Sequence, residues 1–117
     1  MKTVLIVDDS ALMRRMMRSI LISNGFQVVG EAVNGRDGVA KYQELRPDIV
    51  TMDVTMDEMN GLEALGVIMG IDPNAKVVMV SSMGQEVIVR EAIMLGAQNF
   101  IVKPYDDSKV VKILSKL

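Results

Sequence analysis

The regular alternation of short apolar runs with helix-like segments constrains the fold of this chain more than any other feature. Five runs of four to six residues are mostly apolar, at residues 4–7, 27–32, 48–52, 77–80 and 99–102. Four of them are nearly continuous, as in parallel strands that are buried on both faces of a sheet. The run at 27–32 is more polar, so we expect it near an edge.

Segments with a period near 3.6 residues separate the runs and predict helices at about residues 10–23, 34–45, 61–69, 85–95 and 108–117. In the first helix, five apolar residues share one face, which we expect to pack on the core: Met13, Met16, Met17, Ile20 and Leu21. Asn34 is a suitable N-cap for the second helix, and Gly96 a suitable stop for the fourth. Five strands alternating with five helices predict one α/β domain, residues 1–117, with helices on both faces of a parallel sheet.

Two absences from the composition limit the chemistry. The chain has no Cys and no His, which excludes disulfides, thiolate or imidazole metal sites, and a phosphohistidine on this chain. The net charge is −2 without a basic stripe, so we expect no nucleic-acid partner. No apolar run is long enough for a signal peptide or a membrane span, so we expect a cytoplasmic protein without membrane contact.

Chemically active side chains follow four of the apolar runs directly. Ligands of open α/β sheets bind outside the carboxyl ends of the strands, so residues at these ends are candidates for a site. They supply three carboxylates, a hydroxyl group and an ammonium group: Asp8, Asp9, Asp53, Ser81 and Lys103. A single acid at a strand end is often a helix cap or a solvated loop residue. Five such residues at one edge together predict a functional site.

The cluster of Asp8, Asp9 and Asp53 needs a cation, because like charges at close range raise one another's pKa. Lys103 supplies one positive charge and leaves the cluster at −2. Oxygen ligands without His or Cys favour a hard divalent ion, so we expect Mg²⁺, with Mn²⁺ as a second choice. A carboxylate beside Mg²⁺ and Lys103 is suited to attack a phosphoryl group. Ser81 would then donate a hydrogen bond to a phosphoryl oxygen.

At these residues the chain resembles the receiver domains of two-component response regulators, most closely the stand-alone receivers of chemotaxis. The resemblance covers essentially the whole chain, in segments VLIVDDS (4–10), DIVTMDVTM (48–56), EMNG (58–61), VVMVSS (77–82) and GAQNFIVKP (96–104). It implies a flavodoxin-like, doubly wound (βα)5 fold with strand order 2-1-3-4-5. It also implies a phosphoacceptor signalling protein rather than an enzyme.

The resemblance implies a role for each matching residue. Asp53 would be the phosphoacceptor. Asp53, Asp9 and the backbone carbonyl of Thr55 would bind Mg²⁺ directly, and Asp8 would act through metal-bound water. Lys103 would bind the phosphoryl group. The donor would be a CheA-like histidine kinase, and the output a changed affinity for a downstream protein such as the flagellar motor switch. A phosphatase is a further expected partner, and we expect a monomer.

Ser81 and Phe100 occupy the positions of the switch hydroxyl and the switch aromatic residue, and the peptide bond before Pro104 is often cis in this family. Asp57 departs from the family, which usually has Pro there. We expect Asp57 to alter metal affinity or loop mobility without abolishing function. Apolar Met83 predicts a long-lived phosphoryl group, because it would not position a hydrolytic water.

The fourth predicted helix carries apolar residues on two faces. The residues expected to face the core are Val89, Ala92, Ile93 and Gly96. Val87 and Met94 lie on another face, and two interpretations remain for them: scattered exposed apolar residues or a docking surface for a partner helix.

Other functions fit the pattern less well. A flavodoxin-like FMN carrier would need a Ser-, Thr- or Gly-rich loop where Asp8 and Asp9 stand. A haloacid dehalogenase-type phosphatase would need a D-x-D pattern after the first strand. A receiver that never takes a phosphoryl group is disfavoured because all five functional positions are filled. A receiver from a larger regulator, such as a CheB-type methylesterase or a DNA-binding response regulator, remains an alternative.

Overall fold

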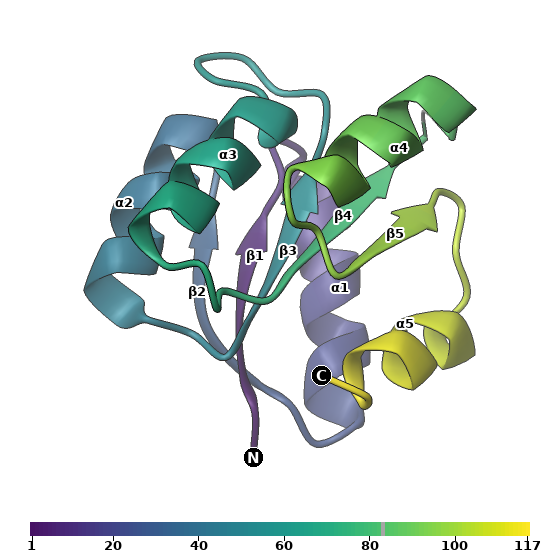
Figure 1. Ribbon diagram of the computed structural model, residues 1–117. Helices are drawn as coiled ribbons and strands as arrows, with labels where there is room; N and C mark the ends of the chain where they lie inside the picture. The colour runs from purple at the N-terminus through teal and green to yellow at the C-terminus, as the bar shows by residue number, and fades with distance from the viewer. Residues whose placement is uncertain (83) are drawn as a thin grey trace.

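The computed structural model describes residues 1–82 and 84–117, so the prediction based on Met83 lies outside the described residues. Within them, strands and helices alternate throughout (Figure 1). The strands are β1 (Thr3–Val7), β2 (Gln27–Ala32), β3 (Ile49–Asp53), β4 (Val77–Ser81) and β5 (Asn99–Val102). The helices are α1 (Ala11–Ser23), α2 (Gly35–Leu45), α3 (Gly61–Ile71), α4 (Glu86–Met94) and α5 (Asp107–Leu114).

The strands form one parallel sheet in the order β2-β1-β3-β4-β5, which confirms the predicted fold class and strand order. Every residue of β3 and β4 is buried, as expected for central strands, and β2 lies at an edge as predicted. The expectation that residues 99–102 are buried on both faces is wrong. β5 forms the other edge, where the sheet leaves Asn99 and Val102 exposed.

The core consists of two apolar clusters on opposite faces of the sheet. Helices α2, α3 and α4 cover one face, and α1 and α5 cover the other (Figure 1). Neighbouring residues of β1 alternate between the clusters, because successive strand side chains point to opposite faces. Leu5 and Val7 belong to the first cluster, and Val4 and Ile6 to the second. Burial on both faces explains why this strand is almost entirely apolar.

Helix α1 follows the predicted pattern with one exception. The Ser10 hydroxyl accepts a hydrogen bond from the Met13 backbone N–H at 3.2 Å and so caps the helix. Met17, Ile20 and Leu21 are buried as expected. The prediction that Met16 faces the core is wrong, since its side chain is 46% exposed. Met16 lies at the margin of the apolar arc, where the helix turns toward solvent.

Helix α4 also differs from its prediction. Ile93 is exposed, whereas Ile88 and Ala92 pack against the first cluster. These two residues are four positions apart and share a helix face, which turns Ile93 outward. Gly96 has φ of +112° after the helix, which confirms the predicted stop.

The N-cap prediction for α2 is confirmed, because the Asn34 side chain accepts a hydrogen bond from the Asp37 N–H at 2.7 Å. Helix α3 extends two residues past its predicted end, to Ile71. Among the residues that the structure describes, no helix is long and apolar enough to cross a membrane.

Candidate functional site

Strand register places the candidate residues beside one another at the carboxyl edge of the sheet. Val7 pairs with Met52, so the residues that follow them, Asp8 and Asp53, leave neighbouring strands at the same level. Asp53 in turn pairs with Val80 of β4. The acids that are far apart in the chain therefore meet because β1 and β3 are adjacent and parallel.

The same register brings the residues of β4 and β5 to this edge. Ser81 pairs with Val102, and the backbone N–H of Lys103 donates to the Ser81 carbonyl at 2.8 Å. The Lys103–Pro104 peptide bond is cis, as the family resemblance led us to expect. Lys103 thus leaves the sheet beside Ser81.

The three predicted acids form a compact cluster. One carboxylate oxygen from each of Asp8, Asp9 and Asp53 lies within 4.8 Å of the others. Asp8 and Asp53 are buried, whereas Asp9 is exposed. The ammonium nitrogen of Lys103 lies 3.1 Å from Asp8 Oδ2 and 3.6 Å from Asp53 Oδ1. The structure therefore brings together the three carboxylates and the lysine.

Burial raises the pKa of Asp53 to about 6; the nearby Lys103 lowers it, and the charges of Asp8 and Asp9 raise it. A carboxylate with this pKa is ionised at neutral pH but lies in a strongly negative site. Three oxygen donors around a common point suit a hard divalent cation, whose charge would relieve that repulsion. The residues present therefore fit the predicted metal.

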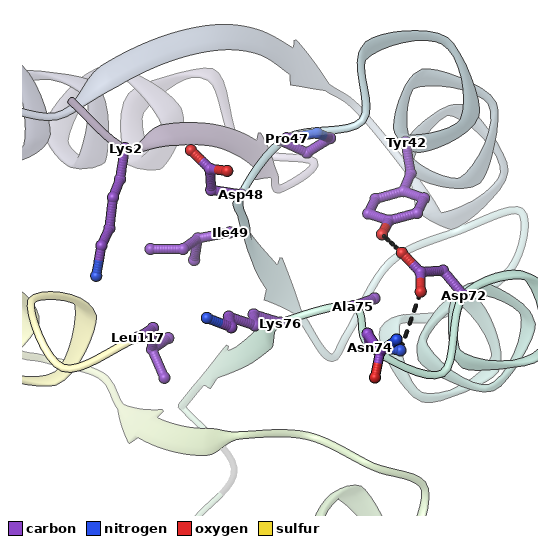
Figure 2. Close-up of a pocket in the computed structure, with 10 residues that line it drawn as sticks. All are labelled: Lys2, Tyr42, Pro47, Asp48, Ile49, Asp72, Asn74, Ala75, Lys76 and Leu117. Atoms are coloured by element: carbon purple, nitrogen blue, oxygen red, sulfur yellow. Dashed lines mark hydrogen bonds between the residues drawn. The ribbon is translucent and has the colours of Figure 1, made fainter.

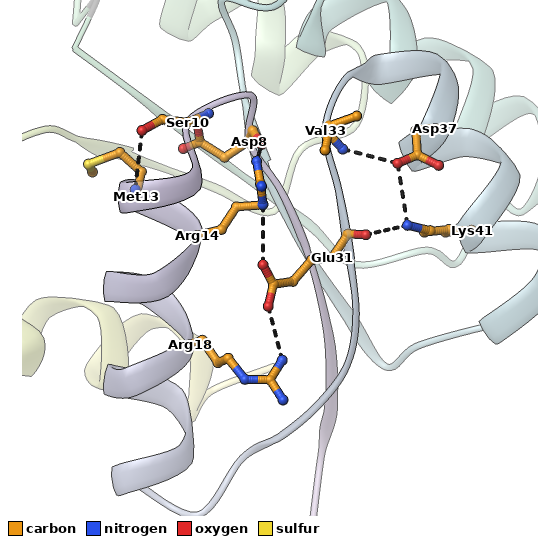
Figure 3. A network of polar contacts seen from close by, with 9 residues as sticks. All are labelled: Asp8, Ser10, Met13, Arg14, Arg18, Glu31, Val33, Asp37 and Lys41. Carbon is orange, nitrogen blue, oxygen red and sulfur yellow. Dashed lines mark hydrogen bonds and ion pairs between the residues drawn. The ribbon is translucent and has the colours of Figure 1, made fainter.

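Asp8 is held by several hydrogen bonds at once (Figure 3). Its Oδ1 accepts from the Ser10 N–H at 2.9 Å, and its own N–H donates to the Ala32 carbonyl at 3.1 Å. Its carbonyl oxygen accepts from the Arg14 guanidinium at 2.8 Å. Arg14 was not expected at the site, because in the sequence it has the pattern of an ordinary surface charge on a helix.

The remaining predicted residues occupy three different environments. Ser81 is 1% exposed. Thr55 is exposed in the segment that follows β3. Phe100 is partly buried against the first apolar cluster.

Two glycines fix the loop that follows Asp53. A Cβ on Gly61 would lie 2.0 Å from the Asp53 carbonyl oxygen, and the Gly61 N–H donates to the Val54 carbonyl at 2.8 Å. A Cβ on Gly35 would lie 2.1 Å from the Met59 carbonyl oxygen. Gly61 was expected as the start of the third helix and as part of a family segment, without a role in the loop. The Asn-Gly pair before a helix was the available signal.

Tyr105 is a second neighbour of the cluster that the sequence analysis missed. Burial raises the pKa of its hydroxyl to about 12, and the charges of Asp8 and Asp107 add to this effect. Its position two residues after Lys103 gave no signal of its own. A phenol is already neutral at neutral pH, so the shift only extends the neutral form of Tyr105 to more alkaline pH.

A polar pocket larger than the cavity beside Asp53 lies at the amino ends of the strands, on the side of the sheet opposite to the acid cluster (Figure 2). Its volume is about 340 Å³. Asp72 there accepts hydrogen bonds from the Tyr42 hydroxyl at 2.8 Å and from the Asn74 N–H at 3.0 Å. Asp48 accepts from the Thr3 N–H at 2.8 Å. These acids hold turns and strand ends together. We therefore take the cluster at the carboxyl edge, despite its smaller cavity, as the functional site.

Comparisons with known proteins agree with this geometry. The response regulator receiver domain family matches residues 4–115. The chemotaxis protein CheY of Thermotoga maritima is 58% identical over 116 residues, which cover 99% of this chain and 97% of that protein.

Two solved structures show the same fold. CheY in a CheX-CheY-BeF3-Mg²⁺ complex from Borrelia burgdorferi is 40% identical, with a TM-score of 0.96 over 98% of this chain and 87% of that chain. The response regulator domain of Thermotoga maritima CheB is 41% identical, with a TM-score of 0.87 over 98% of this chain and 92% of that chain. The chain therefore belongs to the response regulator receiver domain family, within its CheY-type chemotaxis group.

Proposed function

We propose that Asp53 accepts a phosphoryl group from a phosphohistidine on a partner kinase. One observation carries the proposal: Asp53 ends a central strand with its carboxylate 3.6 Å from the Lys103 ammonium and in one cluster with Asp8 and Asp9. As a CheY-type receiver, the chain is a phosphoacceptor signalling protein rather than an enzyme.

The transfer needs a nucleophile and positive charge around it. A carboxylate oxygen of Asp53 attacks phosphorus, a P–O bond forms, and the P–N bond to the donor imidazole breaks. The imidazole nitrogen keeps the bonding electrons and takes up a proton. Lys103 then binds the negative phosphoryl oxygens, and the Ser81 hydroxyl donates a hydrogen bond to one of them.

Mg²⁺ is the cofactor that the donor set favours, with Mn²⁺ as a substitute. Asp8, Asp9, Asp53 and the Thr55 carbonyl would hold it. When bound, it supplies positive charge for the carboxylates and the phosphoryl oxygens. The Mg²⁺ in the related Borrelia burgdorferi complex supports the choice of this metal.

Phosphorylation would shift the population between two packings of Ser81 and Phe100. Ser81 would move toward the phosphoryl oxygens, and Phe100 would turn into the space behind it. The face formed by α4, β5 and α5 would then bind the output target. Partly buried Phe100 lies in β5, which leads directly to Lys103.

The partners follow from the CheY relationship. We infer a CheA-like histidine kinase as phosphoryl donor and a downstream target such as the flagellar motor switch. We also infer that this receiver acts as a monomer in the cytoplasm. The presence of CheX in the Borrelia burgdorferi complex supports a further partner, which we propose to be a phosphatase. The likeness to the CheB receiver supports the alternative, a receiver from a CheB-type methylesterase. The sequence relatives favour CheY, with 58% identity over 116 residues against 47% over 103 residues for the protein-glutamate methylesterase of Archaeoglobus fulgidus.

Intact-mass measurement after incubation with Mg²⁺ and acetyl phosphate tests the proposal. We expect a gain of one phosphoryl group that EDTA prevents and that Asp53→Asn abolishes. Asp57→Asn is the matched control: Asp57 is an exposed acid in the loop that follows Asp53, and its change is not expected to abolish function, so this variant should still gain the phosphoryl group. A wild-type mass that stays unchanged while a known receiver is labelled would contradict the proposal.

A further inference from the structure

We propose that Arg14 is a positioning residue for the metal site, and that Glu31 holds Arg14 in place for this task. The inference rests on the proposed function, because it assumes that Asp8 and Asp9 bind Mg²⁺. Arg14 is not itself a metal ligand. It acts on the peptide group that joins Asp8 to Asp9.

The geometry of the Arg14 guanidinium supports this role (Figure 3). Its Nη1 donates to the Asp8 carbonyl oxygen at 2.8 Å, and its Nε donates to Glu31 Oε1 at 3.2 Å. The side chain is only 17% exposed, although it belongs to a helix that faces solvent. A planar guanidinium with two fixed donors sets the direction of both bonds at once.

Glu31 is itself well anchored in β2. Its Oε2 accepts a hydrogen bond from Arg18 Nη1 at 3.0 Å, and its backbone carbonyl accepts one from the Lys41 ammonium. The carbonyl oxygen of the next residue, Ala32, accepts a hydrogen bond from the Asp8 N–H at 3.1 Å. The same short segment of β2 therefore holds the Asp8 backbone directly at its N–H and, through Arg14, at its carbonyl group.

Clamping this peptide matters because Asp8 and Asp9 lie on either side of it. A rotation of the peptide plane would move both carboxylates relative to Asp53 and would spread the donors. Groups that orient metal ligands typically change metal affinity by roughly 10- to 100-fold when they are removed. Arg14 is therefore expected to tighten Mg²⁺ binding by keeping the donors in place.

A simple charge effect predicts the opposite sign. A guanidinium near the site repels a divalent cation, so removing it would tighten Mg²⁺ binding if charge were its only contribution. Positioning predicts weaker binding after the same change. The direction of the change in Kd therefore separates the two explanations.

Calorimetric titration of the full chain with Mg²⁺ alone, without a phosphoryl donor, tests the inference. We expect Arg14→Ala to raise the Kd for Mg²⁺ roughly tenfold. Arg18→Ala is the matched control: Arg18 also pairs with Glu31, but its guanidinium donates to the Glu31 carboxylate rather than to the Asp8 carbonyl group, so the variant's Kd for Mg²⁺ should stay within about twofold of wild type. Arg14→Lys keeps the charge but not the two-donor fork, and its Kd should stay raised.

A double variant extends the test. Arg14→Ala with Glu31→Ala should bind Mg²⁺ no more weakly than Arg14→Ala alone, because Glu31 acts through Arg14. Unfolding in EDTA identifies variants that do not fold, and Arg14→Lys then replaces Arg14→Ala. Binding that is unchanged or tighter in the folded Arg14 variants would overturn the inference alone. A wild-type chain without Mg²⁺ affinity would overturn the proposed metal site and this inference with it.

Discussion

The ammonium nitrogen of Lys103 lies 3.6 Å from a carboxylate oxygen of Asp53 and lowers the pKa that burial raises. Asp53 is the last residue of β3 and Lys103 directly follows β5, and these two strands lie on either side of β4. Only the parallel register of three strands brings them together. The pair combines a nucleophile with the positive charge that an incoming phosphoryl group needs.

Removing the ammonium group from this pair should slow phosphorylation. We expect Lys103→Met to lower the rate of labelling by acetyl phosphate roughly 100-fold, because one donor to the developing negative charge is lost. The pKa of Asp53 should also rise above its present value of about 6. Mass spectrometry gives the rate, and carboxylate NMR gives the pKa. Lys109→Met, an exposed lysine of α5, should change neither.

The raised pKa of Asp53 predicts how the stability of the metal-free protein depends on pH. The ordinary pKa of 3.8 applies to the unfolded chain and about 6 to the folded one, so the folded state binds more protons between these values. The free energy of unfolding should therefore fall as pH rises through this window, and the whole loss of stability should be present above pH 6.

Asp53→Asn removes the free-energy cost of burying the ionised Asp53 carboxylate. At pH 7.5 in EDTA, we expect it to stabilise the protein by about 1–2 kcal/mol, which is less than the full shift implies because solvent screens part of the charge. The gain should vanish near pH 4. Urea denaturation at both pH values measures the difference. An equal gain at the two values would show that charge burial at Asp53 is not the cause.

The sequence predicted the site because strand ends are easy to recognise. Four of the five apolar runs are followed directly by a polar residue, and parallel strands deliver those residues to one edge, so Asp8, Asp53 and Lys103 were expected to meet. Nothing in the sequence connects Arg14 with Glu31. Their pairing depends on how α1 packs beside β2, and each residue alone has the pattern of a solvated surface charge.

Exposure at the margins of helices and sheets was the least predictable property. Periodicity assigned Met16 and Ile93 to the core, but a small rotation of each helix places them outside it. Val87 and Met94 are exposed and line a groove on α4, which agrees with the prediction that they lie on a different face from the residues that pack on the core.

The two adjacent methionines of α1 should differ sharply in their contribution to stability. Met17 is 3% exposed and Met16 is 46% exposed. We expect Met17→Ala to lower the free energy of unfolding by about 2–4 kcal/mol, because it leaves a cavity between α1 and the sheet. Met16→Ala should change it by less than about 0.5 kcal/mol. Urea denaturation of both variants measures the contrast, and similar losses would contradict the assigned helix face.

Glycine at position 61 should be indispensable, whereas glycine at position 70 of the same helix should not be. A Cβ on Gly61 would meet backbone atoms of Asp53 and Val54, which cannot rotate away as a side chain can. We therefore expect Gly61→Ala to cost about 2–3 kcal/mol and to slow phosphorylation by displacing Asp53. A Cβ on Gly70 would meet nothing within 4 Å, so Gly70→Ala should gain about 0.5–1 kcal/mol from helix propensity.

Urea denaturation and the labelling rate together test this comparison. Because both substitutions add the same methyl group to α3, any difference between them reports on the surroundings and not on the alanine itself. A Gly61→Ala variant with wild-type stability would show that the close approach to Asp53 does not exist. Wild-type labelling in a destabilised Gly61→Ala variant would show that the loop moves without carrying Asp53 with it.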